Sequence, residues 1–316
     1  MKVFLLHPGK ANYPEIAAYS EYFKTKYNCE FLVGKESDFE KIDNKRDYVV
    51  WCIMGFYPNR IDCKKLIHDY RSLSVGRFCA LKDIVKRFFN ASPDLRIFQN
   101  EKIEKVMGFK DGVKSILIPM GVPAWIFEIN KKKSKRKNDL IELCYIGEMS
   151  VERKFDKLLD SYVAWANNNA QSGIRTDLVL VGTPDESIFK KYSSIDSIKF
   201  AGRHTQRDAL QIVKNSDFSI CYFPYHRPHK YQTPTKLLEY AALGGKIICN
   251  DSPSNLDTIN LLKLNCLVTG KNIFDDLDIE SIYSIRDEDG NYLKERISWG
   301  EVLDKSGLYE VISDMQ

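Results

Sequence analysis

The residues from Thr233 to Glu239 combine side chains and spacing that suit the binding of a phosphate and a sugar. Thr233 is a good helix N-cap, and Pro234 suits the first helical position. The first turn of such a helix offers N–H groups and a positive dipole end, which attract phosphate, and Lys236 adds a nearby charge. Thr235 and Glu239 are four residues apart, so they share one face, where the carboxylate can accept both hydroxyls of a ribose. The stretch predicts a nucleotide site; the alternative is an ordinary capped helix that packs on a sheet.

The elements around this stretch have to position it. Residues 223–251 predict the end of a buried strand, a long polar loop, a short helix and another strand. The glycine pair Gly244-Gly245 is expected to end the helix. The apolar face of the helix is formed by four residues, Leu237, Leu238, Ala241 and Ala242. This face is expected to rest on a sheet.

Composition excludes several classes of protein. The chain has 316 residues, of which 44% are hydrophobic and 12% aromatic, so it is long and apolar enough for one large or two medium domains. The formal charge of +4 is too small to indicate nucleic acid, although residues 131–137 carry six basic side chains in seven positions. No apolar run approaches 18 residues, and the N-terminus does not resemble a signal peptide.

The eight cysteines indicate a reducing compartment. They include no CxxC pair, and Cys52, Cys144, Cys221 and Cys249 lie inside apolar runs, where cysteine behaves as a small hydrophobe. A disulfide framework is therefore not expected, and we expect a cytosolic protein.

Apolar strands alternate with helices along the whole chain, which predicts α/β units with mainly parallel sheets. In the first half, strands are expected at 3–9, 29–34, 47–56, 64–70, 95–100 and 113–119, with helices at 12–27, 76–90 and 101–109. In the second half, strands are expected at 141–148, 176–182, 197–202, 218–224, 246–251 and 265–270, with helices at 155–168, 186–194, 207–216 and 255–264 besides the central one.

The domain prediction follows from this pattern. Residues 1–127 form one α/β domain and 138–297 a second, joined by a basic linker at 128–137. The last segment, about 298–316 with Trp299 at its start, is expected to pack back on the first domain. Two doubly wound units leave a cleft between the carboxyl ends of their sheets, where ligands of such folds bind.

Six segments appear in the order seen in one enzyme family. They are IPMGVP, CYIGEMSVERKFDKLLDSY, LVLVGTPDE, IKFAGRH, FSICYFPY and PTKLLEYAALGGKIICND. This ordered set resembles the GT-B-fold nucleotide-sugar glycosyltransferases, most of all the large, usually retaining, bacterial group that builds surface polysaccharides such as lipopolysaccharide and capsule. The resemblance covers about residues 116–270 well and the first half weakly. It implies two Rossmann-like domains that face a cleft.

The resemblance also implies roles for individual residues. Glu239 matches the glutamate that holds the donor ribose, and Pro234, Thr235 and Lys236 match the helix start that cradles phosphate. Lys154 matches the diphosphate lysine. The donor site is completed by five further residues, Gly147, Arg153, Gly202, Arg203 and Tyr231.

His68 is similar to a histidine near the acceptor side, which makes His68, Lys154 and Glu239 the expected catalytic residues. Cations and a helix dipole would stabilise the leaving nucleoside diphosphate, so no metal or other cofactor is expected.

The sequence departs from the family at two positions. Glu148 stands where an arginine usually follows the glycine of the first strand, and Arg153 or Arg203 is expected to supply that charge. Tyr231 stands eight residues before Glu239, where many members carry a second glutamate that contacts the donor sugar. The donor sugar and the stereochemistry of transfer stay open for this reason.

The expected function is transfer of a hexose from a nucleoside-diphosphate sugar, UDP in preference to GDP, to a hydroxyl of a bacterial cell-surface glycan or lipid-linked oligosaccharide. Two alternatives stay open: a non-catalytic GT-B homologue that acts as a binding partner, and a GT-B-fold epimerase or phosphorylase. The basic linker and the basic amphipathic stretch 76–90 suggest peripheral contact with an anionic membrane, although the apolar side of that helix is expected to face the domain core. No nucleic-acid partner is expected.

Overall fold

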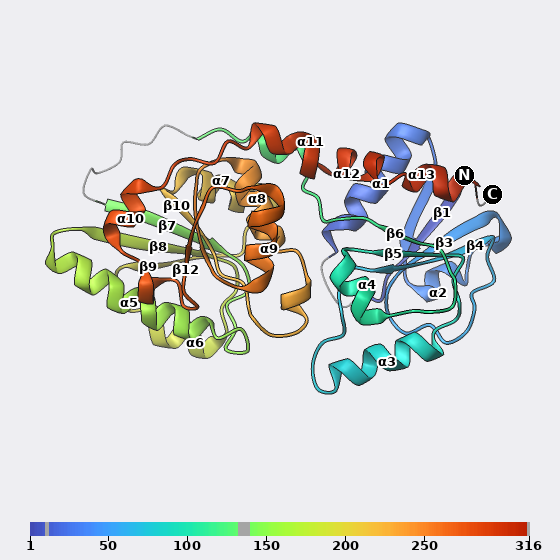
Figure 1. Ribbon diagram of the computed structural model, residues 1–316, viewed down its shortest axis with the longest axis horizontal. Helices are drawn as coiled ribbons and strands as arrows, with labels where there is room; N and C mark the ends of the chain where they lie inside the picture. Colours follow the sequence, from blue (N-terminus) through green and yellow to red (C-terminus); the bar gives the residue numbers. More distant parts are fainter. Residues whose placement is uncertain (10–12, 132–139, 315–316) are drawn as a thin grey trace. The chain divides into compact units, whose positions relative to one another are not determined.

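The computed structural model describes residues 1–9, 13–131 and 140–314 (Figure 1). Most of the predicted basic linker lies outside these residues. Contacts divide the chain into two units, described separately below. The first holds the described residues of 1–123, 231–233 and 296–316, and the second those of 124–230 and 234–295.

The first unit is built on a six-stranded parallel sheet in the order β2-β1-β3-β4-β5-β6. Its strands are β1 (Lys2–Leu6), β2 (Glu30–Gly34), β3 (Tyr48–Ile53), β4 (Lys65–Tyr70), β5 (Leu95–Phe98) and β6 (Ser115–Leu117). Its helices are α1 (Pro14–Tyr27), α2 (Glu36–Phe39), α3 (Cys79–Phe89) and α4 (Glu101–Met107). Every residue of β3 is buried, as expected for a central parallel strand covered on both faces.

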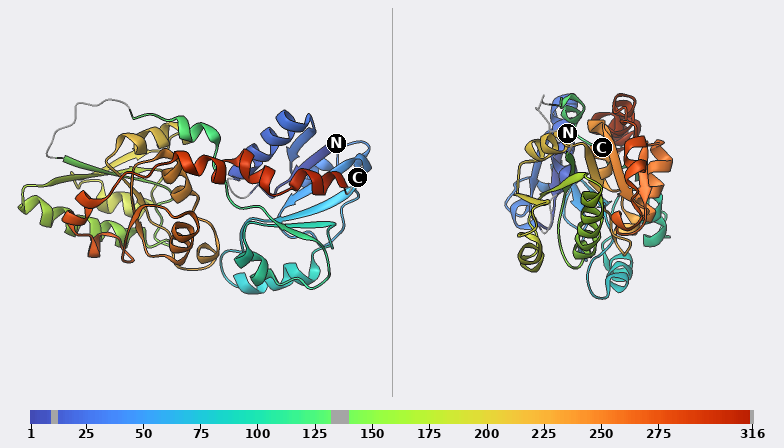
Figure 2. Two further views of the ribbon diagram at one scale, coloured as in Figure 1. Left: turned by 45° about the horizontal axis from the view of Figure 1, so that its top comes forward. Right: turned by 90° about the vertical axis from the view of Figure 1, so that its left-hand side faces the viewer.

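The C-terminal segment completes the first unit. After α11 (Lys294–Ile297), it forms α12 (Trp299–Lys305) and α13 (Leu308–Asp314), which lie beside α1 in both views (Figures 1 and 2). Trp299 packs edge-on against Tyr19 of α1, with ring centroids 5.8 Å apart. The backbone N–H of Trp299 donates to Val122 O at 3.0 Å, which attaches the C-terminal segment to the segment that follows β6.

The second unit has its own six-stranded parallel sheet, in the order β12-β11-β10-β7-β8-β9. Its strands are β7 (Leu140–Ile146), β8 (Arg175–Val181), β9 (Ile198–Gly202), β10 (Phe218–Cys221), β11 (Lys246–Asn250) and β12 (Cys266–Thr269). Its helices are α5 (Phe155–Gln171), α6 (Glu186–Tyr192), α7 (Gln206–Asn215), α8 (Thr235–Leu243), α9 (Pro253–Leu262) and α10 (Ile279–Ser284). The prediction of two doubly wound α/β units is confirmed.

His68, which the resemblance places near the acceptor side, lies inside a strand of the first unit. It is the fourth residue of the six in β4 and its side chain is fully buried. The ring lies between Tyr57 and Tyr70, each with its centroid 6.4 Å away. Neither ring nitrogen has a hydrogen-bond partner among the described residues. Both faces of β4 are covered, so the His68 side chain lies in the core, and its proposed role at the acceptor side stays a prediction.

A close approach of two glycines joins the ends of β7 and β8. Gly147 N donates to Val181 O at 3.0 Å, which brings the turn after β7 against the turn after β8. A Cβ at Gly182, whose φ is +139°, would lie 2.2 Å from Gly147 O. Only glycine fits at this point. The turn after β7 can therefore take this position only because residue 182 is a glycine.

Burial makes His68 a source of pH-dependent stability. Desolvation, helped by the charges of Arg96 and Arg60, lowers the pKa of His68 to about 3. The unfolded chain, with an ordinary histidine pKa of about 6.5, takes up this proton first, so the contribution is present above pH 6.5 and is lost as pH falls towards 3. The loss amounts to about 2 kcal/mol between pH 7 and pH 5. Urea unfolding of the wild type and of His68→Leu at both pH values should show this extra loss in the wild type alone; equal losses would contradict it.

Gly182→Ala is expected to destabilise the second unit more than a matched glycine variant. Gly245 has nearly the same φ, +137°, but open space around a built Cβ. Gly245→Ala should therefore cost only the backbone strain, about 1–3 kcal/mol, and Gly182→Ala about 2 kcal/mol more because of the clash. Chemical unfolding of the two variants measures the difference, and equal costs would show that the turn after β7 moves freely.

Candidate functional site

The reversal of strand order in the second sheet places two loops side by side. The chain runs from β7 outward through β8 and β9, then crosses to β10 on the other side of β7. The carboxyl ends of β7 and β10 thus flank the switch point, where ligands of doubly wound sheets bind. The β7–β10 pairing ends at Cys144 and Ser219, before either strand ends. The N–H of Ile146 instead donates to Tyr240 Oη of α8 at 3.0 Å, which fixes α8 against the end of β7.

The Glu239 carboxylate is the central feature of this region. The residue is 6% exposed, and both of its carboxylate oxygens have partners. Lys236 Nζ contacts Oε2 at 2.7 Å, and Gln206 Nε2 donates to Oε1 at 2.7 Å. A buried carboxylate needs such partners, because an isolated one would be strongly disfavoured. Each oxygen accepts one bond here and has capacity for another.

The start of α8 differs by one residue from the prediction. Pro234, not Thr233, is the N-cap, and the first intrahelical bonds run from the N–H groups of Leu237 and Leu238 to Pro234 O. The Thr233 N–H is used elsewhere and donates to Gln99 Oε1 at 2.8 Å. The N–H groups of Thr235 and Lys236 precede these bonds, at the positions where a helix provides no acceptor. The positive end of α8 therefore lies one turn from Glu239.

The loop after β7 carries the other predicted cations. Lys154 has a left-handed conformation, with φ +59°, and is the N-cap of α5. Arg153 forms an ion pair with Glu148, with Nη2 and Oε2 2.9 Å apart. Tyr222, at the end of β10, donates to Arg153 O at 2.8 Å and joins the two loops. The hydroxyl of Ser150 is buried in the same loop and has no hydrogen-bond partner among the described residues.

Glu148 stands where the sequences that this chain resembles usually have an arginine. The structure places Arg153 beside Glu148, so a cation is present in this loop. Its charge is offset by Glu148, which is more than half exposed. Arg203 lies in the exposed turn after Gly202, which has φ +76°.

Gln206 was missed by the sequence prediction. It is the first residue of α7, directly after the N-cap Thr205, whose side chain accepts from Asp208 N. The helix was predicted from residue 207, one residue after its actual start, and this start places Gln206 beside α8. The partnership with Glu239 is set by the packing of α7 on α8, which local sequence patterns do not reveal.

The loop before α8 contains one predicted donor residue, Tyr231, and two histidines. Tyr231 belongs to the first unit, where its carbonyl accepts from Asn100 Nδ2 at 2.9 Å, and its proposed role on the donor side stays a prediction. His226 and His229 have ring centroids 5.1 Å apart. Burial and the nearby charges of Arg153 and His226 lower the pKa of His229 to about 4. Among the described residues no group of three or more possible metal ligands occurs, and the expectation of no metal cofactor stays a prediction.

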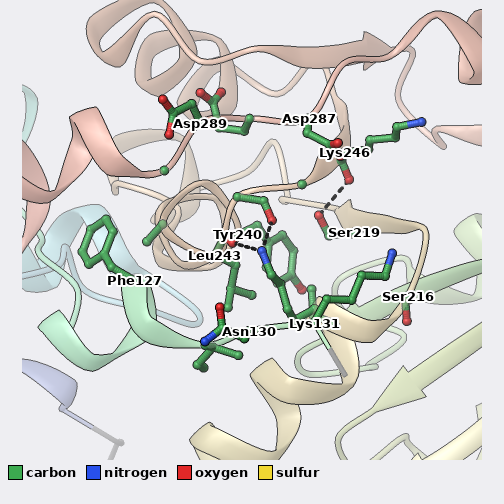
Figure 3. A pocket seen from close by; sticks show the side chains of 18 of the residues that line it. Phe127, Asn130, Lys131, Ser216, Ser219, Tyr240, Leu243, Lys246, Asp287 and Asp289 are labelled. Carbon is green, nitrogen blue, oxygen red and sulfur yellow. Dashed lines mark hydrogen bonds between the residues drawn. The ribbon is translucent and has the colours of Figure 1, made fainter. Parts of the chain in front are cut away.

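A polar pocket of about 430 Å³ lies at the opposite edge of the same sheet (Figure 3). Its lining includes Ser219 and Lys246 from the amino ends of β10 and β11, and Leu243 from the end of α8. Lys214 Nζ donates to Gly244 O at 3.2 Å there and caps the carbonyl end of the helix. None of the predicted donor residues lines this pocket, so it is separate from the site around Glu239.

Comparisons with known proteins yield a likeness in structure. No protein-family model matches the sequence, and no curated protein matches it. A UDP-forming α,α-trehalose-phosphate synthase from Burkholderia xenovorans, in complex with glucose-6-phosphate, superposes with a TM-score of 0.63 over 100% of both chains at 10% identity. The α,α-trehalose 6-phosphate synthase from Burkholderia multivorans gives a TM-score of 0.63 at 12% identity, covering 99% of this chain and 95% of that one.

The pneumococcal O-GlcNAc transferase GtfA, in complex with UDP and GlcNAc, gives a TM-score of 0.58 at 12% identity. The match covers 88% of this chain and 59% of GtfA, so the chain spans less than two thirds of that protein. The likeness extends over both parallel-sheet units in the trehalose-phosphate synthases. The chain therefore has the GT-B fold of nucleotide-sugar glycosyltransferases.

Proposed function

We propose that the chain is a glycosyltransferase that moves a hexose from a nucleoside-diphosphate sugar to a hydroxyl acceptor. The observation that carries this proposal is the buried Glu239 carboxylate, which lies one turn from the start of α8 and is held by Lys236 and Gln206. Ligands of doubly wound sheets bind at the switch point of the strand order, which is where Glu239 lies, so the ligand of this carboxylate is proposed to be the donor nucleotide.

The ribose is the proposed partner of Glu239. Both carboxylate oxygens already have one donor each, and the remaining lone pairs suit two adjacent hydroxyls. Lys236 neutralises the carboxylate, so burial beneath a bound nucleoside leaves no unpaired charge. The diphosphate would then reach the N–H groups at the start of α8.

The leaving nucleoside diphosphate gains negative charge as the glycosidic bond breaks. Lys154 and the positive end of α8 would stabilise this charge, and Arg153 and Lys236 would add to it although each is paired with a carboxylate, Glu148 or Glu239. These groups are placed by α8 and by the loop between β7 and α5, which belong to one unit. Lys154 and Glu239 remain the proposed catalytic and binding pair, whereas the burial of His68 leaves the acceptor-side group unassigned.

UDP is the proposed nucleotide. The structures that resemble this chain include one bound to UDP and several described as UDP-forming. Their acceptors differ, so the acceptor is proposed from the sequence resemblance alone: a bacterial cell-surface glycan or a lipid-linked oligosaccharide. None of the helices among the described residues combines the length and hydrophobicity needed to span a bilayer. We place the enzyme in the cytoplasm, in peripheral contact with the inner face of the plasma membrane.

A second candidate is a non-catalytic homologue that acts as a binding partner. It is favoured by the Glu148–Arg153 ion pair, because the carboxylate occupies the loop that is proposed to bind diphosphate. Such a protein would bind nucleotide weakly or not at all, which separates the two candidates in a single titration.

Glu239→Gln is expected to weaken UDP binding by about 10- to 100-fold, because the hydroxyl bonds to a charged carboxylate become bonds to a neutral amide. Calorimetric titration with UDP and with GDP, without added metal, measures this change. Glu186→Gln is the matched control, since the Glu186 side chain is 81% exposed and forms an ion pair with Lys190 of the same helix. Unchanged affinity in Glu239→Gln would reject the assignment of Glu239.

Glu148→Gln is expected to strengthen UDP binding by about two- to fivefold, because it releases Arg153 from a partly exposed ion pair. Uridine lacks the diphosphate, so its weaker binding should not change in this variant. A titration with both ligands isolates the phosphate contribution. Equal effects on UDP and uridine would show that the loop does not contact the diphosphate.

A further inference from the structure

The α3 helix has its amphipathic pattern turned outward. Of the sixteen large hydrophobic residues that are exposed in the described chain, six lie between Val75 and Phe89. Five of them are 56–70% exposed: Val75, Phe78, Leu81, Phe88 and Phe89. The sixth, Ile84, is 45% exposed. The expectation that this face is turned to the domain core is wrong.

The attachment of α3 explains this orientation. Asp83 is the one buried residue among the eleven of α3, and its carboxylate accepts from Ser74 N at 3.0 Å. Arg87 Nη2 donates to Val106 O of α4 at 3.1 Å. Polar anchors therefore hold the inner side of the helix, and the apolar stripe at positions 78, 81, 84 and 88 is left outward. Figures 1 and 2 show α3 outside the sheet layers of the first unit, with α4 beside it.

The exposed charges within residues 75–90 are all of one sign. The segment 75–90 carries four basic residues and a single carboxylate, that of Asp83, which is buried. The Arg77 guanidinium lies over the Phe78 ring, 4.9 Å from its centroid, and the Arg87 guanidinium lies 5.9 Å from the Phe88 centroid. The exposed Arg77 thus borders an aromatic ring at the surface, whereas Arg87 is partly buried and also bonded to α4. No exposed carboxylate in this segment opposes these cations.

We infer that residues 75–89 form a membrane-docking surface for an anionic bilayer. A helix with large apolar side chains on one face and flanking cations lies in the interface, with its apolar face at the boundary between headgroups and acyl chains. Anionic headgroups attract the basic residues, which adds to the burial of the phenylalanines. A projecting helix face suits a fluid lipid surface, which needs no matching groove. This surface deepens the proposed function and rests on it for the lipid-linked acceptor, but its test needs neither donor nor acceptor.

Vesicle flotation of the full chain tests the inference. We expect binding to vesicles with about 30% phosphatidylglycerol and little binding to pure phosphatidylcholine, with a loss at high salt because the attraction is screened. Phe88→Ser with Phe89→Ser should weaken binding at least about tenfold, as should Arg77→Glu with Lys82→Glu. Leu261→Ser is the matched control, because Leu261 is 72% exposed on α9 of the other unit.

Several outcomes would overturn the inference. They are no binding of the wild type to anionic vesicles, equal loss in the Leu261→Ser control, or a concentration-dependent dimer that the double serine variant abolishes. The last result would assign the surface to a second copy of the chain. In a Phe88→Trp variant, brominated acyl chains should quench the fluorescence of the new tryptophan. Fluorescence quenching no greater than in the wild type would rule out insertion of this residue. UDP titration of the same variants keeps this test separate from the proposed function, since a failed donor site would leave vesicle binding intact.

Discussion

The Glu239 carboxylate is buried, and a buried carboxylate has to be paired. Lys236 from the same helix and Gln206 from α7 meet this requirement. The pairing depends on the position of α8 relative to β7. The Tyr240 hydroxyl fixes this position because it accepts a hydrogen bond from Ile146 N. The helix start, its cation and its carboxylate then form one rigid group at the carboxyl edge of the second sheet. The proposed donor site is a consequence of this arrangement.

The neighbouring loop depends on a different constraint. The contact between Gly147 O and Gly182 leaves no room for a side chain, and it fixes where the chain leaves β7. From there the loop carries Glu148, Arg153 and Lys154 to the start of α5. The ion pair between Arg153 and Glu148 makes this loop less positive than its two basic residues, Arg153 and Lys154, would make it alone. Whether Arg153 stays paired with Glu148 or contacts a diphosphate therefore distinguishes the transferase from the non-catalytic homologue.

Sequence patterns predicted the elements and the fold well, because alternating apolar strands and capped helices are local signals. They placed α8 to within one residue, and the error came from choosing Thr233 over Pro234 as the cap. They predicted the strand that holds His68 but not the burial of its side chain, because the polar residues His68 and Asp69 interrupt the apolar run and both faces of β4 are covered only in the folded sheet. The contact of Gln206 with Glu239 could not be predicted either, because it depends on how α7 packs against α8.

The α3 helix shows the limit of periodicity as a guide. An apolar stripe at helical spacing predicts an amphipathic helix, but it does not say which side faces the protein. Asp83 decided the matter, because its bond to Ser74 N turns the polar side inward. The only sequence signal was a single acid among four bases.

The central claim is that a nucleoside diphosphate binds at the carboxyl edge of the second sheet. Hydrogen exchange of the full chain with and without saturating UDP tests it most directly, because it locates the ligand on the backbone. The account predicts slower exchange in residues 147–154 and 234–239, with the amino-edge segments 214–219 and 244–246 unchanged. Slower exchange confined to those amino-edge segments, or none at all, would contradict it.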